Sequence, residues 1–185
     1  MKNKLWSVLK PALILTAITA VSAAALAGVN ALTADTITRR AEETADRARR
    51  QVIDAAAFEA AALPGEDGES YYKALGENGE TLGYVFTATV SGKSSGLTVM
   101  TGILADGTVA GVVVTEDNET AGYVQKVEKA GLLERLKGLP AAPITAGEDV
   151  DTVAQATKTS KGILRGVNEA IERYTQIKEA ETDGE

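Results

Sequence analysis

The feature that most constrains this chain is an uncharged run from Pro11 to Ala34, longer than any other uncharged stretch in the sequence. A helix crosses the apolar core of a bilayer with about 20 mainly apolar residues, so the run is long enough for one span. Trp6 stands just before it, where interfacial aromatic side chains are common. We therefore predict a transmembrane helix over residues 11–34.

The charges around the run predict its orientation. Those before it are Lys2, Lys4 and Lys10. They favour a cytoplasmic N-terminus over residues 1–10 and a single-pass protein of the inner (cytoplasmic) membrane, with its C-terminal domain on the extracytoplasmic side. Arg39 and Arg40 follow soon after and reduce this asymmetry. The alternative is a cleaved signal peptide, because the small residues of Ser22 to Gly28 suit cleavage. Both interpretations place the rest of the chain outside the cytoplasm.

The next segment predicts a helical connector over residues 35–63. It is rich in Ala, Glu and Arg and contains neither Gly nor Pro, a composition that favours helix. Opposite charges recur four residues apart, as in Glu43 with Arg47, a spacing that suits an exposed helix. Pro64 and Gly65 then end the predicted helix.

Four strand signals follow, and the turns between them predict an antiparallel meander. The predicted strands are Tyr71–Leu75, Leu82–Val90, Leu97–Leu104 and Val109–Thr115. Apolar residues then recur at helical spacing in Gly122–Lys137, with a break near Gly131, and again in Ser160–Lys178. Strands followed by helices predict an α+β fold, an antiparallel sheet packed with helices, over residues 69–178. Residues 179–185 are predicted to be a flexible tail.

The composition excludes several kinds of chemistry. The chain of 185 residues has no cysteine and no histidine, which removes disulfides, thiolate nucleophiles, iron–sulfur ligation and the usual zinc ligands. We therefore expect no metal site and no catalytic residue of its own, and any redox chemistry would come from a bound organic cofactor. The net charge of -7 argues against nucleic-acid binding.

The strongest candidate for a site is Thr157, just before the last predicted helix. Either Thr159 or Ser160 is expected to cap that helix. The N–H groups at a helix start attract phosphate, and Lys158 and Lys161 add positive charge nearby. Local chemistry alone leaves two interpretations open, an ordinary helix cap in a loop or a phosphate site.

Three segments of the chain resemble the bacterial FMN-binding domain family, and the resemblance covers Leu82 to Arg173. The family joins FMN through a phosphoester to the last threonine of Asp-x-x-Ser/Thr-Gly-Ala-Thr, and this chain has Asp151-Thr152-Val153-Ala154-Gln155-Ala156-Thr157. A family segment Glu-Thr-Pro-Gly-Leu-Gly is matched by Glu119-Thr120-Ala121-Gly122-Tyr123-Val124. A helix of the form Thr-Ser-x-x-Val-x-x-x-Val-Asn is matched from Thr159 to Asn168.

The resemblance implies a cofactor and the residues that hold it. FMN would be attached covalently to Thr157. The other implied residues are Asp151, Ala156, Glu119, Thr120, Lys158 and Thr159. Asp151 would be recognised during modification by a flavin transferase. The chain departs from the family pattern at Ala154, Gln155, Ala121 and Val124. Gln155 would obstruct modification if the transferase needs glycine there for a close approach of its backbone.

Within the family, the order of the segments and the N-terminal anchor resemble those of the G subunits of Rnf-type complexes. This implies an electron-transfer subunit of a ferredoxin:NAD oxidoreductase coupled to Na+ or H+ translocation, with other membrane and iron–sulfur subunits as partners. A related alternative is the C subunit of the Na+-translocating NADH:quinone reductase, or a stand-alone extracellular flavoprotein. A different class is a flavin-free, membrane-tethered assembly or binding module, which the Ala154-Gln155 pair would favour. The third alternative is a hydrolase or transferase that acts without partner subunits.

Overall fold

The structure is a computed structural model, and it describes residues 2–65, 68, 70–119 and 121–183. Thr120, one of the candidate residues, lies outside this described part. The chain divides into two compact units, Met1–Ala45 and Asp46–Glu185.

The first unit consists of most of helix α1, which runs over Lys2–Val52. Its large apolar side chains are exposed, with Leu13 62% and Leu32 83% accessible. The hydroxyls of Thr16 and Thr19 each donate a hydrogen bond to the backbone oxygen four residues earlier, so these polar groups are satisfied within the helix. By length and composition, one helix in the described part of the chain could cross a membrane, over Lys10–Val52.

The last turn of α1 belongs to the second unit, and the helix ends earlier than the sequence predicts. The guanidinium of Arg50 donates to the backbone oxygens of Ala55 and Ala56, beyond the helix end at Val52. The predicted helical connector over residues 35–63 is therefore wrong in its last part, where β1 (Ala57–Ala61) forms instead. The helix propensity of this Ala-rich segment is overridden by pairing with a neighbouring strand.

The second unit is built on a five-stranded antiparallel sheet in the order β1-β2-β3-β4-β5. The other strands are β2 (Tyr71–Leu75), β3 (Thr81–Ser91), β4 (Ser95–Leu104) and β5 (Val109–Asp117). Each strand pairs with the next one along the chain, as an antiparallel meander requires. The predicted α+β class and meander are confirmed, with β1 as an additional strand.

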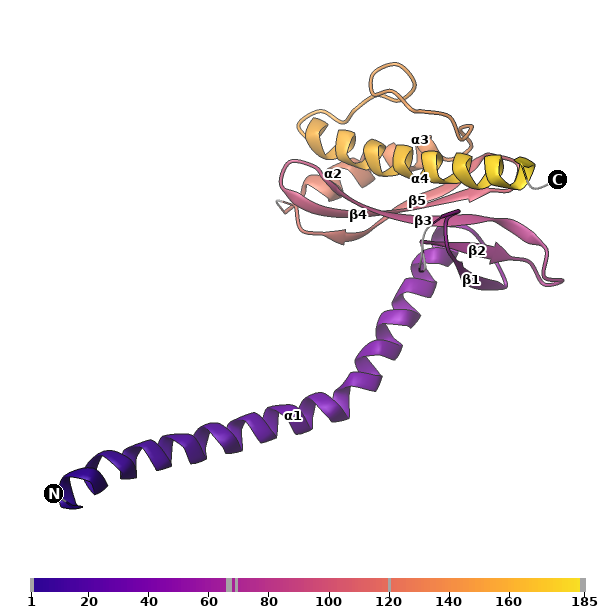
Figure 1. Cartoon of the computed structure of the whole chain (residues 1–185). Helices are drawn as coiled ribbons and strands as arrows, with labels where there is room; N and C mark the ends of the chain where they lie inside the picture. Colours follow the sequence, from indigo (N-terminus) through magenta and orange to yellow (C-terminus); the bar gives the residue numbers. More distant parts are fainter. Residues whose placement is uncertain (1, 66–67, 69, 120, 184–185) are drawn as a thin grey trace. The chain divides into compact units, whose positions relative to one another are not determined.

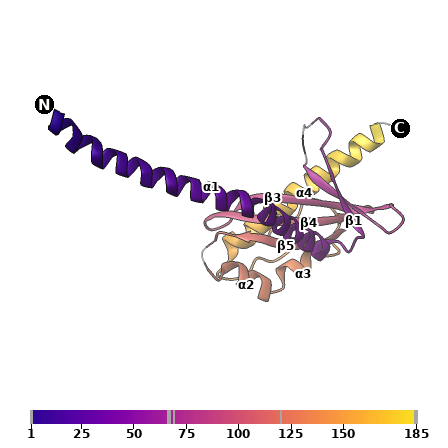
Figure 2. The ribbon, with the colours of Figure 1, turned by 90° about the horizontal axis from the view of Figure 1, so that it is seen from below.

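Three helices follow the sheet: α2 (Tyr123–Lys129), α3 (Leu132–Leu136) and α4 (Thr157–Asp183). Gly131 separates the first two with a left-handed backbone, φ 68°, at the break that the sequence predicts. The last helix packs on β3 and β4 and continues beyond Lys178, into the predicted flexible tail. Figures 1 and 2 show α4 on one face of the sheet and the end of α1 on the other.

The alternation of side chains along the strands gives each face its own apolar cluster. Phe86, Val99 and Ile103 pack with the helices that follow the sheet. Val85 and Met100 face the other way and pack with Val52 and Ile53. Both sheet faces are therefore buried within the second unit, one of them by the end of α1.

Two glycines make room for the end of α1. Gly102 and Gly111 lie opposite each other on β4 and β5. A Cβ atom added to Gly102 would lie 2.6 Å from the Ile53 side chain, and one added to Gly111 would lie 3.0 Å from the Cα of Val52. The glycine pair forms a notch in the sheet that seats the last turn of α1.

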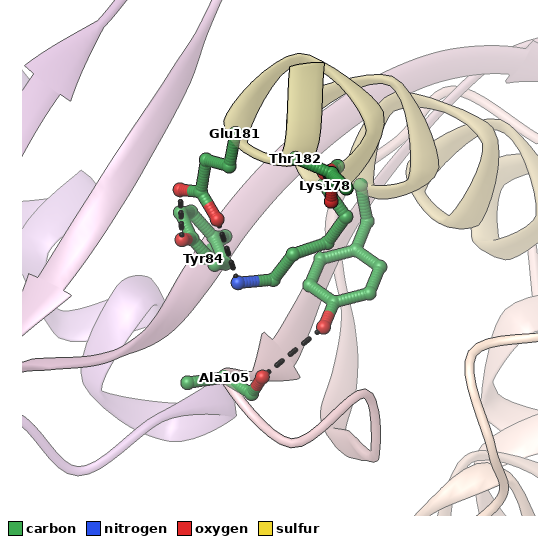
Figure 3. A network of polar contacts seen from close by, with 6 residues as sticks. Tyr84, Ala105, Lys178, Glu181 and Thr182 are labelled. Carbon is green, nitrogen blue, oxygen red and sulfur yellow. Dashed lines mark hydrogen bonds and ion pairs between the residues drawn. The ribbon is translucent and has the colours of Figure 1, made fainter. Parts of the chain in front are cut away.

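Polar and aromatic contacts hold the last turns of α4 to the sheet (Figure 3). The Tyr84 hydroxyl donates to the Glu181 carboxylate at 3.0 Å, and the Lys178 ammonium donates to the other oxygen of that carboxylate at 2.8 Å. The Tyr174 hydroxyl donates to the backbone oxygen of Ala105 at 3.2 Å. Burial, and then the hydrogen bond to Glu181, raise the pKa of the Tyr84 phenol.

Candidate functional site

The site begins where α4 begins. Thr157 and Lys158 are exposed in the first turn, whereas Thr159 and Ser160 are buried. The Ser160 hydroxyl accepts a hydrogen bond from the Val153 backbone N–H at 3.1 Å and donates to the backbone oxygen of Ala156 at 3.0 Å. The helix has already started before these buried residues, so the prediction that Thr159 or Ser160 caps it is wrong. The buried Ser160 side chain instead connects the preceding loop to the first turn of the helix.

Thr159 has a different role from the predicted cap. Its hydroxyl is fully buried and donates to the Glu119 carboxylate at 3.2 Å. The same carboxylate accepts the backbone N–H groups of Lys93 at 3.0 Å and Ser94 at 2.9 Å. Glu119 therefore joins the loop between β3 and β4, the end of β5 and the start of α4.

Two close contacts with glycine allow these segments to meet. A Cβ atom on Gly92 would lie 2.7 Å from a carboxylate oxygen of Glu119, and one on Gly162 would lie 2.9 Å from the Cα of Gly92. Both distances are shorter than real Cβ contacts. The absence of side chains at these positions brings the loop, the carboxylate and the helix together.

A cavity of about 240 Å³ opens in front of this junction. Its walls come from three segments: Lys93 from the loop between β3 and β4, Tyr123 from α2, and residues 155–159 around the start of α4. Thr157 lines it with an exposed side chain. Glu119 lies behind the wall rather than in it. Its two oxygens accept backbone and hydroxyl protons, so it positions the wall.

Positive charge borders the cavity. The Lys93 ammonium donates to the Tyr123 hydroxyl at 2.6 Å and lies 4.1 Å from the centroid of that ring. The Lys126 ammonium lies 5.4 Å from the same centroid. The hydrogen bond from Lys93, then its charge, and to a smaller extent the charge of Lys126 lower the pKa of the Tyr123 phenol. Tyr123 is thus flanked by two ammonium groups.

Gln155 occupies the position that is glycine in the family pattern. Its φ of 65° is left-handed, and it is the only non-glycine residue with positive φ in the described part of the chain. Such a conformation costs roughly 1–2 kcal/mol for a residue with a Cβ. The Gln155 side-chain oxygen accepts a hydrogen bond from the Lys126 ammonium at 3.3 Å. The backbone at this turn therefore keeps the shape that glycine favours, although the residue is glutamine.

The remaining candidate residues are not all in the cavity. Ala156 is buried and Lys158 is exposed, and both line the wall. Asp151 is exposed outside it, and its backbone oxygen accepts a hydrogen bond from Arg135 at 3.4 Å. Lys93 and Tyr123 were not identified as site residues from the sequence. The substitution of Tyr123 for the family leucine was a signal that could have found the second of them.

This geometry suits a phosphorylated cofactor. A hydroxyl in the first turn of a long helix stands beside backbone N–H groups that the helix itself leaves unpaired. Lys93 and Lys158 supply ammonium groups to the same cavity, and such groups bind phosphate as point charges. Thr157 is accessible enough to be modified. These residues fit FMN attached to the hydroxyl of Thr157.

The cavity lies inside a match to a known family. Residues 92–172 match the model of the FMN-binding domain, and residues 1–52 match that of the RnfG N-terminal region. The fold and the site therefore define an FMN-binding domain that follows an N-terminal helix.

Comparison with known proteins shows which group of FMN-binding proteins this chain belongs to. The chain is 32% identical over 197 residues to the G subunit of the Na+-translocating ferredoxin:NAD+ oxidoreductase complex of Acetobacterium woodii, covering 93% of this chain and 94% of that protein. This chain belongs to the family of Rnf G subunits.

It is also 26% identical over 115 residues to the G subunit of the proton-translocating ferredoxin:NAD+ oxidoreductase complex of Clostridium ljungdahlii, covering 59% of this chain and 62% of that protein. The crystal structure of Shewanella oneidensis NqrC is similar with a TM-score of 0.48 and 22% identity, covering 70% of this chain and 73% of that one.

Proposed function

We propose that this chain is the membrane-anchored electron-transfer subunit of a ferredoxin:NAD+ oxidoreductase complex that translocates Na+ or H+, and that FMN is joined to Thr157 through a phosphoester. The observation that carries the proposal is the exposed Thr157 at the start of α4, in a cavity bordered by lysines. This residue lies within the matched FMN-binding region. The 32% identity to a G subunit along nearly the whole chain supports the assignment to the complex.

The roles of the residues follow from their positions. Thr157 supplies the hydroxyl oxygen of the phosphoester, and Lys93 and Lys158 neutralise the phosphate charge. Glu119 and Thr159 hold the loop of Lys93 against the helix that carries Thr157. FMN supplies the electron-transfer chemistry of this domain, whose chain has no cysteine to hold an iron–sulfur cluster.

The N-terminal apolar helix supports a membrane-anchored subunit, and such a subunit needs partners. One apolar helix could span the bilayer, with the domain on the extracytoplasmic side because lysines precede the run. A single span offers no ion path. Ion translocation therefore belongs to other membrane subunits, and electrons reach and leave this domain through redox subunits, iron–sulfur proteins among them. A flavin transferase is the partner for maturation.

Mass mapping of peptides from the full-length chain, purified from its native membrane, tests the proposal. We expect the mass of FMN on the peptide that contains Thr157. A Thr157→Val variant keeps the side-chain shape and should lose the flavin completely. Thr175→Val is the matched control, because Thr175 is also exposed on α4 and its change should leave the flavin in place.

An unmodified wild-type peptide would contradict the covalent link. It would then favour the flavin-free assembly subunit, for which the substitution of Gln155 for glycine in the attachment motif is the specific support.

A further inference from the structure

Two of the lysines at the cavity, Lys93 and Lys126, are each held by a residue that departs from the family pattern. Tyr123, where the pattern has leucine, accepts a hydrogen bond from the Lys93 ammonium at 2.6 Å. Gln155, where the pattern has glycine, accepts one from the Lys126 ammonium at 3.3 Å. Leucine and glycine offer no acceptor on their side chains. Tyr123 therefore positions the Lys93 ammonium, and Gln155 positions that of Lys126.

The cavity wall has the opposite charge to the chain as a whole. The chain carries a net charge of -7, yet the described residues that line the cavity include Lys93 and Lys158 and no carboxylate. The nearest carboxylate at this junction, that of Glu119, is buried behind the wall and accepts three hydrogen bonds.

We propose that Tyr123 is a positioning residue that holds the Lys93 ammonium at the flavin cavity, and that this ammonium, together with that of Lys126 on Gln155, raises the redox potential of the flavin. This inference rests on the proposed attachment of FMN to Thr157. Each electron that a reduced partner subunit delivers adds one negative charge to the flavin ring system. The same electron later leaves for an oxidised partner subunit, and no bond to the protein forms or breaks.

The physical basis is a difference between two oxidation states. A fixed positive charge stabilises the reduced flavin, which has gained negative charge, more than the oxidised flavin. An unrestrained lysine on the surface would spend much of its time in solvent, and its charge would be screened by salt. The hydrogen bond to the Tyr123 hydroxyl and the ring beneath the ammonium restrain Lys93 at the cavity.

Potentiometric titration of the full-length flavoprotein, with FMN first verified by peptide mass, tests the proposal. Lys93→Met and Tyr123→Leu should each lower the midpoint potential, and the double variant should fall little further than either single variant because both remove the same contact. Lys129→Met is the control, since Lys129 is an exposed lysine on the same helix as Tyr123 but does not line the cavity. Its potential should equal that of the wild type. Unchanged potentials in Lys93→Met and Tyr123→Leu would overturn the proposal and leave the covalent flavin unaffected.

A second measurement needs no flavin. In the Thr157→Val protein, ultraviolet absorbance during alkaline titration follows ionisation of the tyrosines, and a Tyr123→Phe difference isolates Tyr123. The charged groups that act on this phenol are Lys93 and Lys126; Lys158 lines the same cavity, and the Glu119 carboxylate is bound behind its wall. Ionisation of Tyr123 should move to higher pH in Lys93→Met. If Tyr123 ionises at the same pH in Lys93→Met, the hydrogen bond between Lys93 and Tyr123 does not exist in solution and the positioning role is refuted. Absence of FMN on wild-type Thr157 would instead refute the proposed function, and this inference with it.

Discussion

The buried hydroxyl of Thr159 donates to the buried carboxylate of Glu119 at 3.2 Å, across forty positions of sequence. This hydrogen bond joins the end of the sheet to the first turn of α4, two residues from Thr157. The same carboxylate also fixes the backbone of Lys93. The segment that carries Thr157 and the loop that borders its cavity therefore depend on one side chain.

Replacing either partner of this bond should destabilise the domain without removing the flavin. Thr159→Val keeps the shape but leaves a buried carboxylate oxygen short of one donor, which costs about 1–3 kcal/mol. Glu119→Gln turns an amide N–H₂ group toward backbone donors and should cost a similar amount. Urea unfolding measures the free energy, and peptide mass measures the flavin. Loss of flavin from stably folded Thr159→Val protein would argue that the modified residue is not Thr157 alone.

Gln155→Gly should stabilise the domain and increase modification. Removing the Cβ atom relieves the left-handed strain at φ 65°, which after the entropic cost of glycine gives a gain of about 1 kcal/mol. Flavin occupancy on co-expression with a flavin transferase should rise if Gln155 hinders the approach of the enzyme. Ala154→Gly is the neighbouring control and should be destabilising, because the backbone of Ala154 is not left-handed. Equal stability changes in the two variants would speak against this explanation.

The contact between Lys178 and Glu181 should stabilise the domain only within a window of pH. The hydrogen bond to Lys178 lowers the pKa of the Glu181 carboxyl from its ordinary value of 4.5, so its contribution is present above that pH and is lost as pH falls through the lowered pKa. The hydrogen bond to Glu181 raises the pKa of Lys178 from 10.5, so its contribution is present below that pH and is lost as pH rises through the raised pKa.

The size of this effect is limited by exposure. The two side chains are 38% and 51% accessible, so the contribution should stay below about 1 kcal/mol. Glu181→Gln should therefore unfold slightly more easily than the wild type near neutral pH and equally easily once the pH is below the lowered pKa of Glu181, where the carboxyl is protonated. Glu179→Gln, a change at an exposed position on the same helix, serves as control. A deficit of Glu181→Gln that persisted unchanged in acid would assign the effect to packing.

Protease added to spheroplasts tests the membrane arrangement. The domain should be digested without lysis, because the lysines before Pro11 favour a cytoplasmic N-terminus. The first residues should remain on the mature chain. A mature N-terminus near Ala25 to Val29 would identify a cleaved signal peptide, and full protection of the domain until lysis would reverse the orientation.

The sequence predicts most of the fold because its strongest signals are local. The turns around the strands and the helical spacing near Gly131 report on neighbouring residues, and the structure agrees with them. The prediction from sequence fails at Ala57–Ala61, where pairing with β2 decides the conformation of a segment rich in helix formers. This pairing joins residues that are distant in sequence, and the helix propensity of a single segment carries no information about such contacts.

Prediction of the site succeeded for local features and failed for contacts between distant residues. Thr157 could be found because it ends a contiguous motif, and the cavity wall contains it. The partnership of Glu119 with Thr159 and that of Lys93 with Tyr123 join residues from different elements, so neither has a sequence spacing to reveal it. Thr159 was assigned as a cap because a hydroxyl near a helix start usually caps it, whereas here a distant carboxylate binds it.

The notch formed by Gly102 and Gly111 sets where a soluble fragment of this protein can begin. Val52 and Ile53 fill that notch, although they lie at the end of the helix that also contains the apolar run. A fragment that starts at Asp46 keeps this turn and the covered sheet face. One that starts at β1 would leave apolar strand residues open to water and invite aggregation. A truncation that removes only the apolar run therefore preserves the folded domain, whereas one that removes all of α1 does not.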